Sequence, residues 1–498
     1  MSTSFDLAPA RPVSFGVKPV LYLVGMVLMA TAMMMVLPLC VDLAHGDADW
    51  RAFAFAAAIA ASLGGACLIY GRGSLTAGLT LRQAFVLTPL SWVSVALVSA
   101  FPFYLSGYGI VAGSIADALF ESVSGITTTG ATVISGLDEA PPGMLLWRGL
   151  LQWMGGIGII ASAVAILPAL GIGGMQLFRT ESSDRSEKAL PQIRQIVTTI
   201  GGVYLGMTGI AITTYWLAGM PVLDAVVHGM TSIATGGYAN SDASFGVWDQ
   251  NGMQWYASAF MLAGSIPFVL YVRAVAGEAR ALLDRQVLTL VVFLTIVITG
   301  LGLWLSLNGL YEVEPAFRHA AFNVISVIST TGYASADYAL WGNAIVGLFF
   351  GLTFIGGCTG STSGGIKIFR FEVMAVMLRT HFMRLLYPNG VFPRSYGQKK
   401  LDDDVIGSVV AFFAVYFICY GAITIIMMAL GLDFLTSASG AATALSNVGP
   451  GLGEIIGPSG NFGPLPDTAK LLLSFAMLLG RLELFTILVL FIPRFWRG

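Results

Sequence analysis

Four short segments of this chain repeat one pattern, a small or polar residue followed by Thr or Val and then Gly, each closing an apolar stretch. A filter for a dehydrated cation can be built from four converging Thr/Val-Gly backbones whose carbonyl oxygens replace water. The repeat therefore predicts four equivalent units within one chain. The segments read Thr128-Thr129-Gly130, Ala234-Thr235-Gly236, Thr330-Thr331-Gly332 and Asn447-Val448-Gly449.

The composition predicts a membrane protein. Of the 498 residues, 56% are hydrophobic and 10% are charged, whereas a soluble domain carries about a quarter charged residues. Apolar runs such as 20–41 and 405–430 are long enough to cross a bilayer. The net charge of −2 gives no basic footprint for nucleic acid. The four cysteines lie in or beside apolar runs without metal-type spacing, so we interpret them as small buried hydrophobes.

The distribution of Lys and Arg predicts the orientation. Basic residues gather near both termini and in several connecting segments, and four other loops contain none. By the positive-inside rule the basic segments face the cytoplasm. We therefore expect a multi-pass membrane protein with cytoplasmic N- and C-termini. The loops without Lys or Arg are 42–50, 107–125, 220–255 and 432–466.

The repeat predicts an all-α polytopic fold of ten spanning helices and four re-entrant half-helices. Each unit is a helix, a half-length pore helix, the Thr/Val-Gly turn and a second helix. We expect half-helices at 114–128, 222–235, 316–330 and 434–447. The chain divides into a cytoplasmic N-terminus (1–18), a two-helix hairpin (19–82) and pore repeats at 83–190, 191–284, 285–403 and 404–498.

The half-helices predict a cation inside the membrane. Each is too short to span and begins with polar or capping residues on the external side. Their C-terminal ends then carry partial negative charge towards the membrane centre. Irregular backbone at this depth is tolerated where it lines a cavity or is buried in protein. The alternative interpretation is four tight turns with Gly as a C-cap.

Five longer motifs resemble the TrkH/KtrB group of potassium-translocating membrane subunits, and the resemblance covers nearly the whole chain. It implies one pseudo-fourfold pore per chain, a homodimer, surrounding membrane lipid and a cytosolic nucleotide-binding subunit of the TrkA type. The N-terminal hairpin is closer to TrkH than to KtrB. The motifs are 126–132 (ITTTGAT), 152–158 (QWMGGIG), 329–333 (STTGY), 356–367 (GGCTGSTSGGIK) and 446–451 (SNVGPG).

The resemblance implies roles for three sets of residues. The four Thr/Val-Gly segments form the filter, and Gly at 130, 236, 332 and 449 implies a preference for K⁺. Arg481 points into the pore and acts as a barrier to cations. A structural pairing of Arg481 with Glu483 or with an Asp is the alternative, although residues two apart on a helix do not face each other, which makes Glu483 a poor local partner. The small polar segment 356–366 forms an intramembrane gating loop made of Gly356, Gly357, Thr359, Gly360, Ser361, Thr362, Ser363, Gly364 and Gly365.

Several other polar residues keep two interpretations. The gating loop could instead be a helix contact made by small residues. We expect Lys367 and Arg370 to extend to the cytosolic interface. Arg148 and Gln152 lie four apart on one helix and could support the first filter segment from behind. The alternative is that Arg148 is an ordinary interfacial arginine. Asp117 and Glu121 either attract cations or bond to the back of the filter.

Other function classes find less support in the sequence. No hydrolase, metalloprotease or dinucleotide motif stands in a suitable context, so we expect no enzyme activity and no nucleotide site in this chain. A transporter with inverted repeats would have two broken helices in opposed halves, whereas we expect four like-oriented units with one further break, in the third. The predicted function is K⁺ uptake as the membrane subunit of a Trk-type system. An H⁺- or Na⁺-coupled symporter and a less selective K⁺/Na⁺ pathway remain alternatives, and the loops 171–194 and 379–404 could dock a partner or simply be solvated.

Overall fold

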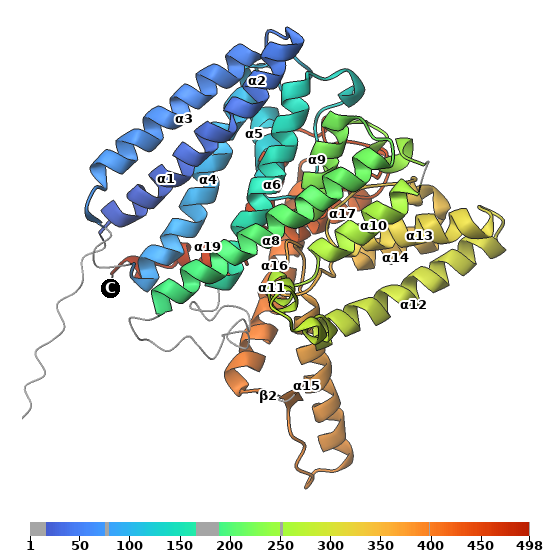
Figure 1. Ribbon diagram of the computed structural model, residues 1–498. Helices are drawn as coiled ribbons and strands as arrows, with labels where there is room; N and C mark the ends of the chain where they lie inside the picture. Colours follow the sequence, from blue (N-terminus) through green and yellow to red (C-terminus); the bar gives the residue numbers. More distant parts are fainter. Residues whose placement is uncertain (1–15, 75–78, 166–188, 250–251, 398, 498) are drawn as a thin grey trace, which may run out of the picture.

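The computed structural model describes residues 16–74, 79–165, 189–249, 252–397 and 399–497, and this part of the chain is mainly helical (Figure 1). The one strand pair among these residues is β1 (Ser395–Tyr396) with β2 (Lys399–Lys400), which is antiparallel. Most of the predicted cytoplasmic N-terminus (1–18) and most of the loop 171–194 lie outside the described residues. The expectations for those segments therefore stay predictions.

A helical hairpin forms the N-terminal part of the structure. It consists of α1 (Lys18–Met34), α2 (Val36–His45) and α3 (Trp50–Tyr70). A Cβ at Gly25 would lie 2.8 Å from the Gly64 carbonyl oxygen, so two glycines let α1 and α3 approach closely. The hairpin packs along α4, as Figure 1 shows in blue.

Four repeats follow the hairpin, and in each one a long first helix packs against a short half-helix. Repeat 1 contains α4 (Leu81–Leu105), α5 (Ile115–Ile126) and α6 (Pro142–Ala165). Repeat 2 contains α8 (Ala189–Leu217), α9 (Val222–Ile233), α10 (Met253–Gly264) and α11 (Phe268–Val275). Repeat 3 contains α12 (Arg285–Leu307), α13 (Val313–Ile328), α14 (Asn343–Leu352) and α15 (Ile368–Leu386). Repeat 4 contains α16 (Asp403–Ala429), α17 (Phe434–Ser446), α18 (Asp467–Arg481), α19 (Phe485–Leu488) and α20 (Pro493–Arg497).

Short 3₁₀ turns connect several of these helices. They are η2 (Leu137–Glu139), η4 (Ser244–Val247), η5 (Ala279–Leu283), η6 (Tyr338–Trp341) and η7 (Val489–Phe491).

Three of the four junctions between repeats are contacts between the second helix of one repeat and the half-helix of the next. The contact pairs are α6 with α9, α10 with α13 and α18 with α5, and the last of these joins repeat 4 back to repeat 1. The half-helices α5, α9, α13 and α17 are buried over their C-terminal parts and exposed only in their first turns, whereas the outer helices expose large apolar side chains such as Leu303 and Leu307. The ends of the half-helices that carry the Thr/Val-Gly turns are therefore enclosed by protein.

The prediction of one additional break, in the third repeat, is wrong. Helices α10 and α11 meet at 94°, and α18 and the segment 485–491 meet at 105°. Pro267 immediately precedes α11 and has no amide hydrogen to continue a helical ladder. Glu483 and Leu484 have φ of 60° and 33°, which ends α18 just after Arg481. The apolar run 471–492 is thus two helices.

These breaks also change the count of spans. Seven helices in the described residues are long and apolar enough to cross a membrane, and each bent pair adds one, which gives up to nine. The predicted ten is reached only when α14 and α15, separated by the segment 353–367, are taken as one interrupted span.

Candidate selectivity filter and intramembrane gate

All four half-helices end in the same turn. One or two residues after each helix end stands a residue with a left-handed backbone, with φ of 51° at Thr128, 50° at Thr235, 57° at Thr330 and 55° at Asn447. A β-branched residue at positive φ is a genuine outlier. The described part of the chain has seven non-glycine residues with positive φ, and these four are among them. Such strained positions cluster at functional sites.

The hydrogen bonds of the four turns match as closely as their dihedral angles. In each turn the amide after the left-handed residue donates to a carbonyl five residues earlier, which is the longer bond of a Schellman motif. The pairs are Thr129 N to Ser124 O (2.9 Å), Gly236 N to Thr231 O (2.9 Å), Thr331 N to Ser326 O (2.8 Å) and Val448 N to Thr443 O (3.1 Å).

This equivalence corrects the register predicted for the second segment. Two residues after each left-handed residue stands a glycine with positive φ, and in repeat 2 that glycine is Gly237 (φ 80°), not Gly236. Ala234 falls at the end of α9, one place before the left-handed Thr235. We therefore define the filter segments as 128–130, 235–237, 330–332 and 447–449.

The filter segments lie in a closed ring. A Cβ built on Gly130 would come within 3.0 Å of the Gly236 carbonyl oxygen, and the same holds for each following pair around the molecule. The last pair returns to repeat 1, so the four segments surround one axis. The remaining pairs are Gly237 with Thr331 O, Gly332 with Val448 O, and Gly449 with Thr129 O.

The carbonyl oxygens at the middle of these segments are mostly unpaired. Within the described residues no hydrogen-bond donor reaches the carbonyls of Thr129, Thr331 or Val448, although all three residues are buried. Buried carbonyls are normally paired. The equivalent carbonyl of Gly236 accepts a bond from Gln152 Nε2 (2.6 Å). A buried ring of carbonyl oxygens, three of them unpaired, is chemically able to coordinate a hard cation.

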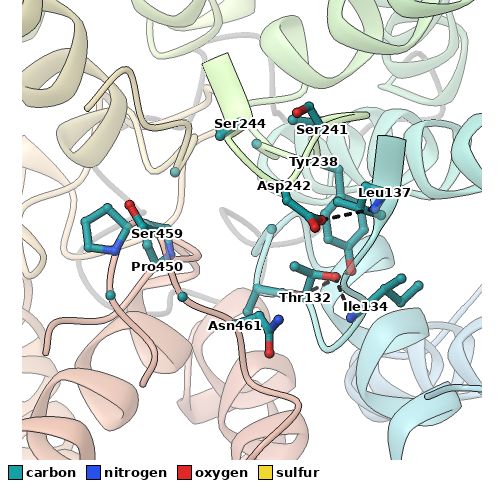
Figure 2. A pocket seen from close by; sticks show the side chains of 18 of the residues that line it. Thr132, Ile134, Leu137, Tyr238, Ser241, Asp242, Ser244, Pro450, Ser459 and Asn461 are labelled. Carbon is teal, nitrogen blue, oxygen red and sulfur yellow. Dashed lines mark hydrogen bonds between the residues drawn. The ribbon is translucent and has the colours of Figure 1, made fainter. Parts of the chain in front are cut away.

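A cavity of about 150 Å³ opens on one side of the ring. Gly130, Gly237, Gly332 and Pro450 contribute to its lining. Figure 2 shows Thr132 and Tyr238 on one side of it and Ser459 on the other. The Asp242 carboxylate in its wall accepts bonds from the amides of Gly136 (2.7 Å) and Leu137 (3.1 Å). Among the described residues no group of three His, Cys, Asp or Glu side chains could hold a metal ion.

The predicted gating loop lies against the ends of three half-helices. The Thr362 hydroxyl contacts Thr235 Oγ1 (3.1 Å), and the Gly364 amide donates to Thr330 Oγ1 (2.6 Å). A Cβ at Gly364 would come within 3.0 Å of the Ser446 carbonyl oxygen. The segment is irregular, so the alternative of a helix contact made by small residues does not describe it. Its role in gating stays a prediction.

Arg481 contacts this loop and not Glu483. Its Nη1 donates to the Thr362 carbonyl (2.9 Å), and its Nε and Nη2 have no partner among the described residues, although the residue is only 2% exposed. Glu483 instead pairs with Arg370, whose guanidinium carbon lies 3.7 Å from the centroid of the Phe412 ring.

The expectation that Lys367 and Arg370 extend to the cytosolic interface is wrong. Arg370 is fully buried, and Lys367 is 7% exposed with its ammonium donating to the Ser363 carbonyl. Both side chains are held by partners inside the protein. The partner of Arg370 is 113 residues away in the sequence, so no local pattern indicated it.

The polar residues behind the filter form a network that joins repeats 1 and 2. Arg148 donates to Glu121 Oε1 (2.8 Å) and to the Ala239 carbonyl (2.8 Å), and its guanidinium lies 4.0 Å from the Tyr238 ring centroid. Gln152 contacts the second filter segment rather than the first. Arg148 is 1% exposed, so it is no interfacial side chain.

Two of the residues left open by the sequence are ion-paired. Asp117 pairs with Lys470 on α18 (2.5 Å), and both side chains are at most 5% exposed. Glu121 pairs with Arg148. Neither carboxylate is therefore free to attract a cation. Lys470 was missed because its partner belongs to another repeat, and only the closure of repeat 4 on repeat 1 brings them together.

The fold defines a polytopic α-helical membrane protein of four pore-type repeats. A profile of the TrkH family, described as a cation transport protein, matches residues 52–497. The Trk system potassium uptake protein TrkI of Halomonas elongata is 48% identical over 96% of this chain and 97% of its own. TrkH of Escherichia coli is 34% identical over 95% of this chain and 98% of its own.

Structural comparison gives the same result. The crystal structure of the potassium transporter TrkH from Vibrio parahaemolyticus superimposes with a TM-score of 0.88 at 33% identity, covering 96% of this chain and 99% of that one. The chain therefore belongs to the TrkH family of cation transport proteins. The fold class and the family predicted from the sequence are confirmed.

Proposed function

We propose that this chain takes up K⁺ across the bacterial inner membrane through a gated pore, as the membrane subunit of a Trk-type system without catalytic chemistry of its own. The observation that carries the proposal is the closed ring of four filter segments, in which three of the four buried middle carbonyl oxygens have no hydrogen-bond donor among the described residues. The names of the relatives, which are potassium uptake proteins, support the choice of ion.

The filter segments would replace the hydration shell of K⁺. Rings of backbone carbonyls do this in cation-selective pores, and the C-terminal ends of α5, α9, α13 and α17 add negative dipole ends near the ring. Only glycine fits at 130, 237, 332 and 449, because a carbonyl oxygen of the adjoining segment occupies the space that a Cβ would need. A side chain at any of these positions would displace that carbonyl.

The loop 356–366 and Arg481 would close the pathway on the inner side. The loop is hydrogen-bonded to the left-handed Thr235 and Thr330, and Arg481 holds it through the Thr362 carbonyl. Conduction requires these contacts to break, because they fill the space next to the filter. A fixed positive charge there also raises the barrier to a cation.

Assembly and orientation belong to the same proposal. We expect a homodimer with cytoplasmic termini and a cytosolic nucleotide-binding subunit of the TrkA type, with no nucleotide bound by this chain. Because the relatives are named as parts of a Trk system, a multi-component complex is the natural setting. The described part of the loop 379–404 carries basic residues that could contact such a partner.

Uptake of Rb⁺ into proteoliposomes that contain only this chain tests the proposal. Uptake driven by an inside-negative potential alone, and little reduced by excess Na⁺, is expected for a K⁺-selective pore. Uptake that requires an H⁺ or Na⁺ gradient would favour coupled symport instead. Absence of uptake in the wild type and in Arg481→Ala, with and without a cytosolic partner, would contradict the pore.

A further inference from the structure

The second filter segment lacks the side chain that fixes its counterparts. In repeats 1 and 3 the middle residue is a threonine whose hydroxyl bonds to a hydroxyl two residues earlier, Thr129 to Thr127 (2.8 Å) and Thr331 to Ser329 (2.7 Å). In repeat 4 the middle residue is Val448, which is 1% exposed and packs in an apolar cluster. In repeat 2 it is Gly236, with no side chain and with another glycine after it.

Gln152 occupies the place of the missing side chain. A Cβ at Gly236 would come within 3.0 Å of the Gln152 side-chain oxygen and amide carbon. The amide bridges the glycine pair, with Nε2 donating to the Gly236 carbonyl (2.6 Å) and Oε1 accepting from the Tyr238 amide (3.0 Å). Gln152 is fully buried, and its helix α6 belongs to repeat 1.

The same carbonyl also faces the first filter segment. The Gly236 oxygen is the atom nearest to a Cβ on Gly130, so its position sets how closely segments 128–130 and 235–237 approach. Two adjacent glycines have more backbone freedom than Thr-Gly or Val-Gly. Without an external clamp, the carbonyl could turn away from the ring.

We propose that Gln152 is a positioning residue for ion selectivity, which holds the Gly236 carbonyl in the ring by bridging Gly236 and Tyr238. The inference rests on the proposed function, since it assigns to Gln152 a role in the ion selectivity of that filter. It also accounts for the polar side chain at this depth on α6. In this way a side chain of repeat 1 fixes the glycine pair of repeat 2, which has no side chain of its own to do so.

The test compares three variants in proteoliposomes. Gln152→Met keeps the length of the side chain and removes both bonds, and Gln152→Glu keeps the acceptor for Tyr238 N but loses the donor to Gly236 O. Gln254→Met is the matched control. Gln254 is also a buried glutamine, it lies on α10, and its Oε1 accepts a hydrogen bond from Arg318 (2.9 Å). K⁺/Na⁺ selectivity, uptake rate and thermal unfolding are measured for each.

Gln152→Met is expected to lower the K⁺/Na⁺ ratio by about fivefold to tenfold, the effect of two lost hydrogen bonds near the lower end of their ordinary net strength. Gln152→Glu should fall between Met and the wild type, and Gln254→Met should keep the wild-type ratio even where its stability falls. A folded Gln152→Met with an unchanged ratio would overturn the proposal. If Met does not yield folded protein, an unchanged ratio in Gln152→Glu overturns it equally.

The failure of the clamp differs from the failure of the filter. If Gly130→Ser alters the ratio while the Gln152 variants do not, only the role of Gln152 is wrong. If neither position alters the ratio, the assignment of the filter itself is wrong. An equal fall in the Gln254→Met control would reduce Gln152 to a structural role and overturn the proposal.

Discussion

Gly237→Ala is the sharpest test of the corrected filter register. Gly237 has φ of 80°, and its Cβ would come within 3.0 Å of the Thr331 carbonyl oxygen, a separation that side chains essentially never show. The left-handed backbone costs an alanine about 1–2 kcal/mol, and overpacking adds about 1–3 kcal/mol. The oxygen must retreat to 3.4 Å or more before the contact is ordinary.

The consequence of Gly237→Ala is a displaced carbonyl in the ring. We expect the K⁺/Na⁺ ratio, measured by ion competition against Rb⁺ uptake in proteoliposomes, to fall about tenfold or more, which is ~1.4 kcal/mol of lost discrimination. The free energy of unfolding, followed by thermal unfolding, should fall by the sum of these two costs. A folded Gly237→Ala protein with the wild-type ratio would refute the reasoning.

Two comparisons separate the causes. Gly46 has φ of 74° and no atom within 4 Å of its Cβ, so Gly46→Ala carries the backbone cost without the clash and should leave the ratio unchanged. Gly236→Ala would clash with a side chain, that of Gln152, and not with a backbone carbonyl. Truncation of Gln152 to Ala would remove the two closest of these contacts and leave only the one to its Cβ (2.9 Å), whereas no such truncation is available for Gly237→Ala.

Three further substitutions test the gate and the closure of the ring. Arg481→Ala should raise the uptake rate about tenfold or more, because a unit charge near the path contributes on the order of 1–4 kcal/mol at 4 Å; an unchanged rate argues against a barrier. Thr330→Val removes the acceptor for the Gly364 amide, so we expect faster uptake without a partner at an unchanged ion ratio, and slower uptake would contradict a closed loop. Lys470→Met leaves Asp117 buried and unpaired and should cost about 3–5 kcal/mol in thermal unfolding, which the additional change Asp117→Asn should largely recover; a wild-type melting curve for the single variant would show that the pair does not join repeats 4 and 1.

The half-helices could be predicted because their signals are local. Polar starts and a Thr/Val-Gly end bracket an apolar stretch too short to span, and the structure ends α5, α9, α13 and α17 within three residues of the expected positions. The register of repeat 2 could not be predicted so simply. The left-handed residue in these turns is Thr or Asn and not Gly, and with glycines at both 236 and 237 the sequence does not say which one is strained.

The two breaks in the second helices differ in how far the sequence predicts them. Pro267 is a visible signal, since proline interrupts the ladder of backbone hydrogen bonds. The break at 482–484 has no such signal, because its residues are Leu, Glu and Leu. That break depends on tertiary contacts, among them the pairing of Glu483 with Arg370 of repeat 3.

The four repeats hold similar turns by different means, which a single chain allows and a symmetric tetramer does not. Repeat 1 keeps α6 without a break in its described part, and this helix carries both Arg148 and Gln152 to the back of the filter. In repeats 2, 3 and 4 the second helix is interrupted, and the loop 356–366 bonds to the first two of these repeats and to Arg481 of the last. On the proposed function, the unbroken helix of repeat 1 would support the filter, and the contacts that would have to break for conduction lie in the three repeats with interrupted helices.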